Sequence, residues 1–164
     1  MESIARRTHT CGELRSEQAG QTVTIQGWVD SVRDKGGVMF LILRDRYGSI
    51  QVTLDERCGE AAWTDAKAAR LEYVLQVEGV VHERASGAVN QKMETGKIEI
   101  LASKVRLLSP TKPLPFQISA DATASEEVRL IFRSLDLRRP PLQNALLLRH
   151  KAALATRTYM DSMG

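Results

Sequence analysis

The segment from Gly27 to Leu54 constrains the fold most strongly, because its apolar residues recur at every second position. This alternation is typical of β-strands that bury one face. The stretches Lys35–Gly37 and Arg46–Gly48 have turn composition, so we expect an antiparallel meander of three strands. The expected strands are Gln21–Asp30, Val38–Arg44 and Ser49–Leu54. The residues expected on the buried face are Val23, Ile25, Met39, Leu41, Leu43, Ile50, Val52 and Leu54.

The opposite face of these strands carries side chains that suit a nucleotide. It is expected to present Phe40, Arg44, Gln51 and Thr53, with Arg33 on the turn before the second strand. An aromatic ring can stack on a base, and guanidinium and carboxamide groups can bind base edges and phosphates. We therefore expect this face to be the working surface.

The remainder of the first two thirds of the chain completes a small barrel. An alanine-rich helix is expected at Glu60–Leu71, and strands are expected at Tyr73–Val81 and Ile98–Leu107, separated by the long loop His82–Lys97. Five strands with a helix between the third and fourth is the order of the OB-fold, a Greek-key barrel that often binds oligonucleotides. The predicted fold class is mainly β.

The composition changes after Leu108, where prolines predict an extended linker. A helix is expected at Ser125–Leu137, with Pro140 and Pro141 closing it, and a longer amphipathic helix at Leu142–Met163. The expected domains are an OB-fold at 1–108, a hinge at 109–141 and a helical segment at 142–164.

The chain of 164 residues has a net charge of only +3, a balance that suits nucleic acid without requiring it. We find no apolar run that could span a bilayer and no signal peptide, and we expect a cytoplasmic protein. Cys11 and Cys58 are far apart and lack a CxxC partner, so we expect reduced thiols and no metal site.

Four segments, in order and spacing, resemble bacterial-type aspartyl-tRNA synthetases: RTHTCGELR, GWVDSVRDKGGVMFLILRDRYGSIQV, METGKIEI and SLDLRRP. The resemblance implies an anticodon-binding OB domain up to about Leu108 and a hinge that leads into a class II catalytic domain. The final RHKAALATRTYMDSMG looks like the start of motif 1, the dimer-interface helix of that family. Because motifs 2 and 3 are absent, we expect a truncated chain that binds tRNA(Asp) without activating aspartate.

For the parent protein, the resemblance implies an aspartate–tRNA ligase that is a cytoplasmic homodimer and uses ATP and Mg²⁺. No cofactor is expected in this part of it. The anticodon contacts of the family fall here on Arg33, Phe40, Gln51, Arg84 and Glu99. Asn90 is a weaker candidate for the third anticodon base.

The side-chain chemistry fits these assignments. Phe40 can stack on the central uracil of the anticodon, and Gln51 can pair with the edge of that base. Arg33 can bind a phosphate or a base carbonyl, and Glu99 can accept hydrogen bonds from the guanine at the wobble position. The chain departs from many bacterial members at Ser31, where a second arginine is common.

Two alternatives stay open. One is a generic single-strand nucleic-acid module on the same fold, which predicts sequence-tolerant stacking and a steep salt dependence. The other is a protein-interaction domain that dimerises through the final amphipathic helix.

Overall fold

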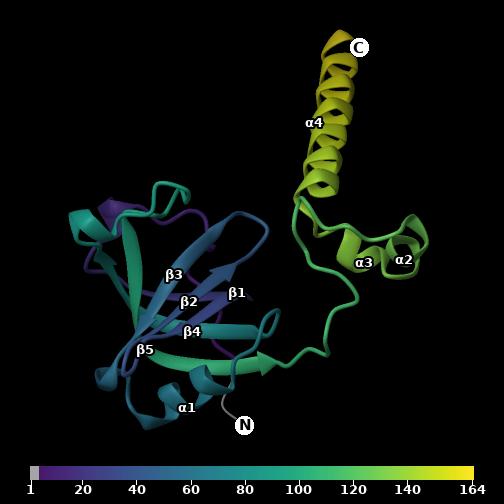
Figure 1. Cartoon of the computed structure of the whole chain (residues 1–164). Coiled ribbons are helices and arrows are strands. Elements are labelled where there is room, and N and C mark those ends of the chain that lie inside the picture. Colours follow the sequence, from purple (N-terminus) through teal and green to yellow (C-terminus); the bar gives the residue numbers. More distant parts are fainter. Residues whose placement is uncertain (1–3) are drawn as a thin grey trace. The chain divides into compact units, whose positions relative to one another are not determined.

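The computed structural model describes residues 4–164, and the chain divides into two compact units. The first unit ends at Lys112 and the second spans Pro113–Gly164. In the described part of the first unit, five strands form a closed barrel with the order β1-β2-β3-β5-β4 (Figure 1). The strands are β1 Thr22–Asp34, β2 Met39–Arg44, β3 Ser49–Leu54, β4 Val74–Glu83 and β5 Ile98–Ser109. The predicted OB-fold barrel is confirmed.

Short helical elements connect the strands. The one α-helix in the described part of this unit is α1 at Glu60–Ala68, between β3 and β4 as expected, and it packs Ala62 and Ala66 into the core. It ends before the predicted Leu71 because Ala69 is already extended. The 3-10 turns are η1 Ser16–Gln18, η2 Glu56–Cys58 and η3 Ser86–Ala88.

The barrel core is the set of residues that the alternation predicts. Each of the eight predicted inward residues on the first three strands is at most 2% exposed. Leu75, Val77 and Val81 of β4 are buried with them. Burial of this continuous apolar surface is the main force that closes the barrel.

The first strand is longer than the sequence predicts. It continues to Asp34, which pairs with Met39 of β2, and a bulge between Val29 and Ser31 bends it. Arg33 therefore lies on β1 and not on a turn, and the turn consists of residues 35–38. The β4 strand likewise runs two residues past the predicted end, to Glu83.

Gly79 allows β4 and β5 to approach closely. The register of this strand pair shifts between Glu78 and Gly79. A Cβ atom built on Gly79 would lie 2.3 Å from the carbonyl oxygen of Leu101 and 2.7 Å from a methyl carbon of Ile100. A side chain does not fit there without moving the β5 backbone, so close packing of the two strands explains the glycine at this position.

The second unit contains the helices α2 Glu126–Ile131, α3 Arg133–Asp136 and α4 Pro140–Met163. Ser125 caps α2 by accepting a hydrogen bond from the amide of Val128, but the chain breaks at Phe132, so one predicted helix is in fact two. Pro140 and Pro141 begin α4 and do not close the preceding helix. A proline fits the first turn of a helix, where its missing N–H has no partner to lose.

A buried carboxylate organises the start of this unit. Asp136 is fully buried and accepts hydrogen bonds from Arg129 at 3.0 Å, Arg133 at 2.8 Å and Arg139 at 3.2 Å. Arg139 also donates to three backbone carbonyls between Ser119 and Ala122. The hydrogen bond from Arg129 is the largest cause that lowers the pKa of Asp136 below its usual range.

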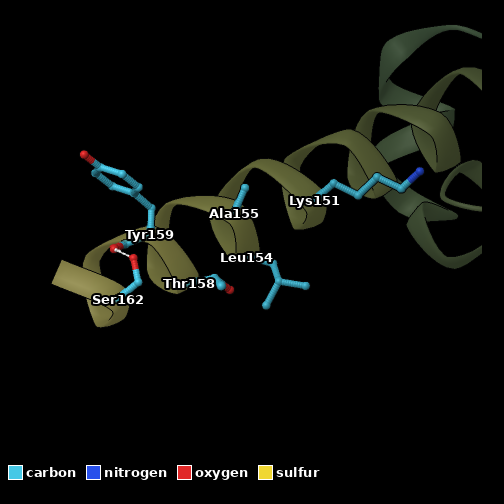
Figure 2. A pocket seen from close by; sticks show the side chains of 6 residues that line it. All are labelled: Lys151, Leu154, Ala155, Thr158, Tyr159 and Ser162. Atoms are coloured by element: carbon cyan, nitrogen blue, oxygen red, sulfur yellow. Dashed lines mark hydrogen bonds between the residues drawn. The ribbon is translucent and has the colours of Figure 1, made fainter. Parts of the chain in front are cut away.

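A shallow, open pocket lies along the C-terminal half of α4. Figure 2 shows the side chains that line it, and all of them come from α4 itself. They are Lys151, Leu154, Ala155, Thr158, Tyr159 and Ser162. The hydroxyl of Ser162 donates to the carbonyl of Tyr159 at 2.6 Å, one turn back on the same helix. Among residues 4–164, no helix is long and apolar enough to cross a membrane.

Candidate nucleic-acid interface

Three neighbouring strands place an aromatic ring and a guanidinium side by side outside the barrel core. Phe40 on β2 pairs with Arg33 on β1 and with Thr53 on β3. Directly paired residues of antiparallel strands project to the same face with their Cβ atoms about 5 Å apart. Phe40 is partly buried and Arg33 is exposed. Within residues 4–164, the side chain of Arg33 makes no hydrogen bond or ion pair, so its guanidinium is available to a ligand.

A hydrogen-bonded cluster continues this face. We call it the Gln51 cluster; its members are Gln51, Thr53, Arg84 and Glu99. Nε2 of Gln51 donates to Oε2 of Glu99 at 2.8 Å, and Oε1 of Gln51 accepts from Nη2 of Arg84 at 3.0 Å. The Thr53 hydroxyl donates to the same Glu99 oxygen at 2.7 Å and lies 3.3 Å from Nε2 of Gln51.

Burial within the Gln51 cluster differs from the sequence-based expectation. Gln51 and Thr53 are each 9% exposed, whereas the alternation placed both on an open surface. Closure of the barrel causes this burial. The β5 strand pairs with β3 in parallel and brings Glu99 alongside Gln51 and Thr53. A hydrogen-bonded carboxamide that is mostly buried is held more rigidly than one in solvent.

The loop after β4 supplies Arg84. Its backbone amide donates to the carbonyl of Lys97 at 2.8 Å, which closes the loop on itself. Nη1 of Arg84 approaches the carbonyl of Gly96 at 3.5 Å, and the Thr95 hydroxyl ties the loop to β3 through Ser49 at 2.6 Å. These bonds explain how a loop residue reaches into a strand-borne cluster.

Asn90 lies on the same loop but outside the Gln51 cluster. Its backbone amide donates to the carbonyl of Gly96 at 3.0 Å, and its Oδ1 accepts from the amide of Lys92 at 3.1 Å. A Cβ on Gly96 would lie 1.8 Å from the carbonyl oxygen of Asn90, so the loop backbone is tightly packed at this point. The structure therefore brings Arg84, Gln51 and Glu99 together, and it leaves Asn90 separate from them.

Glu99 offers an acceptor although it is already hydrogen-bonded. Both of its donors, Gln51 and Thr53, use Oε2. In the part of the chain that the structure describes, Oε1 of Glu99 accepts no hydrogen bond. His82 on β4 is its cross-strand partner and is exposed. A ligand with hydrogen-bond donors can therefore still bind to this carboxylate.

Arg44, which was expected on the same surface, has a different role. Its guanidinium pairs with Asp30 at 2.9 Å and with Glu72, and it lies over the ring of Trp28 at 5.9 Å from the centroid. With these partners it is only 16% exposed. We conclude that Arg44 stabilises the end of the strand and that its guanidinium is occupied by partners within the barrel.

Sequence reasoning assigned no role to the Thr53 hydroxyl. Its carboxylate partner is 46 residues away, and the contact depends on a parallel strand pair that local patterns do not reveal. The only signal was a polar residue at an alternate strand position. Among the described residues, no three His, Cys, Asp or Glu side chains are grouped so that they could hold a metal ion.

Known proteins resemble this chain along nearly its whole length. It is 51% identical over 158 residues to the aspartate–tRNA(Asp/Asn) ligase of Acidobacterium capsulatum and 46% identical over 159 residues to that of Bacillus mycoides. These matches cover 96% and 97% of this chain but only 26% and 27% of the relatives. The chain thus spans about a quarter of the length of the curated relatives that it matches.

Solved structures agree with these relatives. The asparaginyl-tRNA synthetase of Pyrococcus horikoshii, complexed with asparaginyl-adenylate, has a TM-score of 0.82 at 25% identity and matches 98% of this chain and 35% of its own. The aspartyl-tRNA synthetase of Entamoeba histolytica has a TM-score of 0.74 at 25% identity, with coverage of 92% and 36%. The predicted resemblance to aspartyl-tRNA synthetases is confirmed. The family model described as "OB-fold nucleic acid binding domain" matches residues 23–108, and the chain belongs to this family.

Proposed function

We propose that this chain recognises the anticodon of tRNA(Asp) as part of an aspartate–tRNA ligase. The observation that carries the proposal is the pairing of Phe40 with Arg33 beside the Gln51 cluster, which places stacking, charge and hydrogen-bonding groups on one face. The names of the relatives with 46–51% identity support the choice of tRNA.

Each group has a chemically suited target in the anticodon GUC. The ring of Phe40 stacks on the central uracil, and Gln51 hydrogen-bonds to the edge of that base. The unused Oε1 of Glu99 accepts from the ring N–H and amino group of the guanine. Arg33 binds a backbone phosphate or a base carbonyl, and Asn90, on the loop after β4, contacts the third base.

The proposal extends to tRNA(Asn). Both relatives are named for tRNA(Asp/Asn), and the anticodons GUC and GUU share their first two bases. The groups of the Gln51 cluster and Phe40 are assigned to those shared bases. Discrimination between the two tRNAs then depends on the third base, for which this chain offers only Asn90 among the assigned residues.

In the proposed parent enzyme, a cytoplasmic homodimer, this domain makes and breaks no covalent bond. Its binding energy is gained only with the correct anticodon and helps to position the acceptor end of the tRNA for aminoacylation. We assign ATP and Mg²⁺, which drive that reaction, to the larger part of the relatives that this chain does not span. We assign residues 109–141 to a hinge and residues 142–164, which contain most of α4, to the start of a class II catalytic domain.

Binding of short RNA hairpins tests the proposal. Fluorescence anisotropy would measure the affinity for anticodon stem-loops that carry GUC, GUU or a scrambled triplet, each at two salt concentrations. We expect GUC and GUU to bind more tightly than the scrambled loop at both concentrations. Equal affinity for all three, with a steep loss at higher salt, would instead identify a generic single-strand binder.

A further inference from the structure

The geometry points to a lock on the Gln51 carboxamide: Arg84, Glu99 and Thr53 hold it in one orientation, which selects uracil over cytosine at the central base. This inference rests on the proposed function, because it concerns the base assigned to Gln51. It gives these three residues a positioning role beyond any contact of their own with RNA.

The two neighbours of the carboxamide have opposite and fixed chemistry. A guanidinium can only donate hydrogen bonds, and an ionised carboxylate can only accept them. Oε1 of Gln51 therefore belongs beside Arg84, at 3.0 Å, and Nε2 beside Glu99, at 2.8 Å. Turning the carboxamide over would set its amino group against the guanidinium and its oxygen against the carboxylate. Both charge-assisted hydrogen bonds would be lost.

Burial makes the lock effective. Gln51 and Thr53 are each 9% exposed, so water cannot readily replace the lost partners after a flip. Thr53 strengthens the arrangement, because its hydroxyl donates to Oε2 of Glu99 at 2.7 Å and holds that oxygen in place. Without the Thr53 hydroxyl, the Glu99 carboxylate would be held less firmly and would restrict the orientation of the Gln51 carboxamide less.

The locked carboxamide keeps one donor and one acceptor for a ligand. Oε1 of Gln51 has two lone pairs, and Arg84 occupies one of them. The two acceptors near Nε2, on Thr53 and Glu99, lie only 2.7 Å apart. They are too close to take separate hydrogens from two diverging N–H bonds, so one hydrogen serves both. The second hydrogen of Nε2 is left.

This remaining pair matches uracil and opposes cytosine. Uracil offers an N3–H donor beside a carbonyl acceptor, which meet the oxygen and the amide hydrogen of Gln51. Cytosine presents the reverse, an N3 acceptor beside an amino donor. A free carboxamide would simply turn over to suit cytosine, whereas a locked one cannot. We expect the wild-type chain to prefer uracil by about 5- to 150-fold, the range for a good bidentate pair.

The test is a ratio of affinities. Anisotropy titrations would compare stem-loops with GUC and GCC anticodons for the wild type and for four variants. In Glu99→Gln the new side chain can donate or accept, and in Thr53→Val the hydroxyl is lost with little change in shape. We expect both variants to lower the uracil preference at least threefold, in the range of one lost hydrogen bond or more. Thr53→Ser, which keeps the hydroxyl, should retain the wild-type preference for uracil.

Phe40→Ala is the matched control. Stacking does not distinguish uracil from cytosine strongly, so this variant should weaken both loops and leave their ratio unchanged. A purely structural defect would do the same, and thermal melting would detect it. If Glu99→Gln or Thr53→Val keeps the wild-type ratio, the lock is wrong while the proposed function stands. If the wild type itself binds GUC and GCC equally, both the proposed function and the lock are wrong.

Discussion

Replacing Phe40 by leucine isolates the stacking energy of the interface. Leucine keeps an apolar side chain against the partly buried site but has no π-face. The core residues beside it, Met39 and Leu41, point to the opposite side of β2 and are at most 2% exposed. We therefore expect the free energy of unfolding to fall by only about 1 kcal/mol, below the cost of a large-to-small change inside the core.

The effect of Phe40→Leu on RNA binding should be larger. The strand neighbours of Phe40 are Arg33 and Thr53, so this row of the sheet contains a single ring and can stack a single base. Loss of one stacked base costs about 1–3 kcal/mol, or about 5- to 150-fold in affinity. Phe40→Tyr retains the ring and should bind within a few-fold of the wild type.

The assay is anisotropy of a labelled GUC stem-loop at one fixed salt concentration, because affinity for RNA depends on salt. Thermal denaturation of each variant would confirm that the barrel is folded. Leucine and tyrosine variants that both bind as tightly as the wild type would refute the stacking role of Phe40, whatever the rest of the interface does. Equal weakening of both variants would point to a steric fit in place of stacking.

Three further predictions concern stability and reactivity. Gly79→Ala should lower the free energy of unfolding by about 1–3 kcal/mol in denaturant titrations, because its Cβ would clash with the β5 backbone; an unchanged midpoint would contradict this close approach. The pKa of Asp136 is lowered in the folded chain, so its stabilisation is present above the unfolded carboxyl pKa of about 4 and is lost as the pH falls through the folded pKa. The protection of the α3 amides, taken relative to the exchange rate of an unstructured chain at each pH, should therefore fall in acid for the wild type. Asp136→Asn should show low protection at every pH, and equal protection in both chains across the pH range would show that the carboxylate does not stabilise α3. Burial raises the pKa of the Cys11 thiol, so a thiol reagent at pH 8 should label it only after unfolding, and rapid labelling of the folded chain would show that the site opens.

The predictable part of this fold is the part that local periodicity controls. Alternation along the strands identified the inward residues, because a side-chain period of two leaves no other face for the core. The end of β1 was predicted at Asp30 and missed because the next four residues contain a single apolar side chain, Val32, whereas pairing with β2 determines where the strand stops. The two prolines after Arg139 were assigned to a helix end, although the same residue type also begins helices.

The candidate site was predictable as a set of residues but not as an arrangement. The strand alternation and the resemblance both indicated Gln51, and the resemblance alone indicated Arg84 and Glu99; side-chain chemistry gave each a plausible target. The hydrogen bonds among them depend on contacts between residues 33 to 48 positions apart, formed by barrel closure and by a loop that folds back. A single sequence contains no local signal for such contacts. Only the structure could therefore show that Gln51 is buried and that the Thr53 hydroxyl binds Glu99.

A carboxylate in a proposed RNA site requires an explanation, because it repels phosphates. In the Gln51 cluster, two donors share one oxygen of Glu99, and the nearby Arg84 offsets its charge through the carboxamide of Gln51. A base without hydrogen-bond donors would leave the remaining oxygen of Glu99 desolvated and unpaired. The carboxylate therefore lowers the affinity for such bases more than the affinity for guanine. A net charge of only +3 gives the chain a weak overall electrostatic attraction to RNA phosphates. Specificity in such a domain must therefore come mainly from groups whose donors and acceptors are fixed before the RNA arrives.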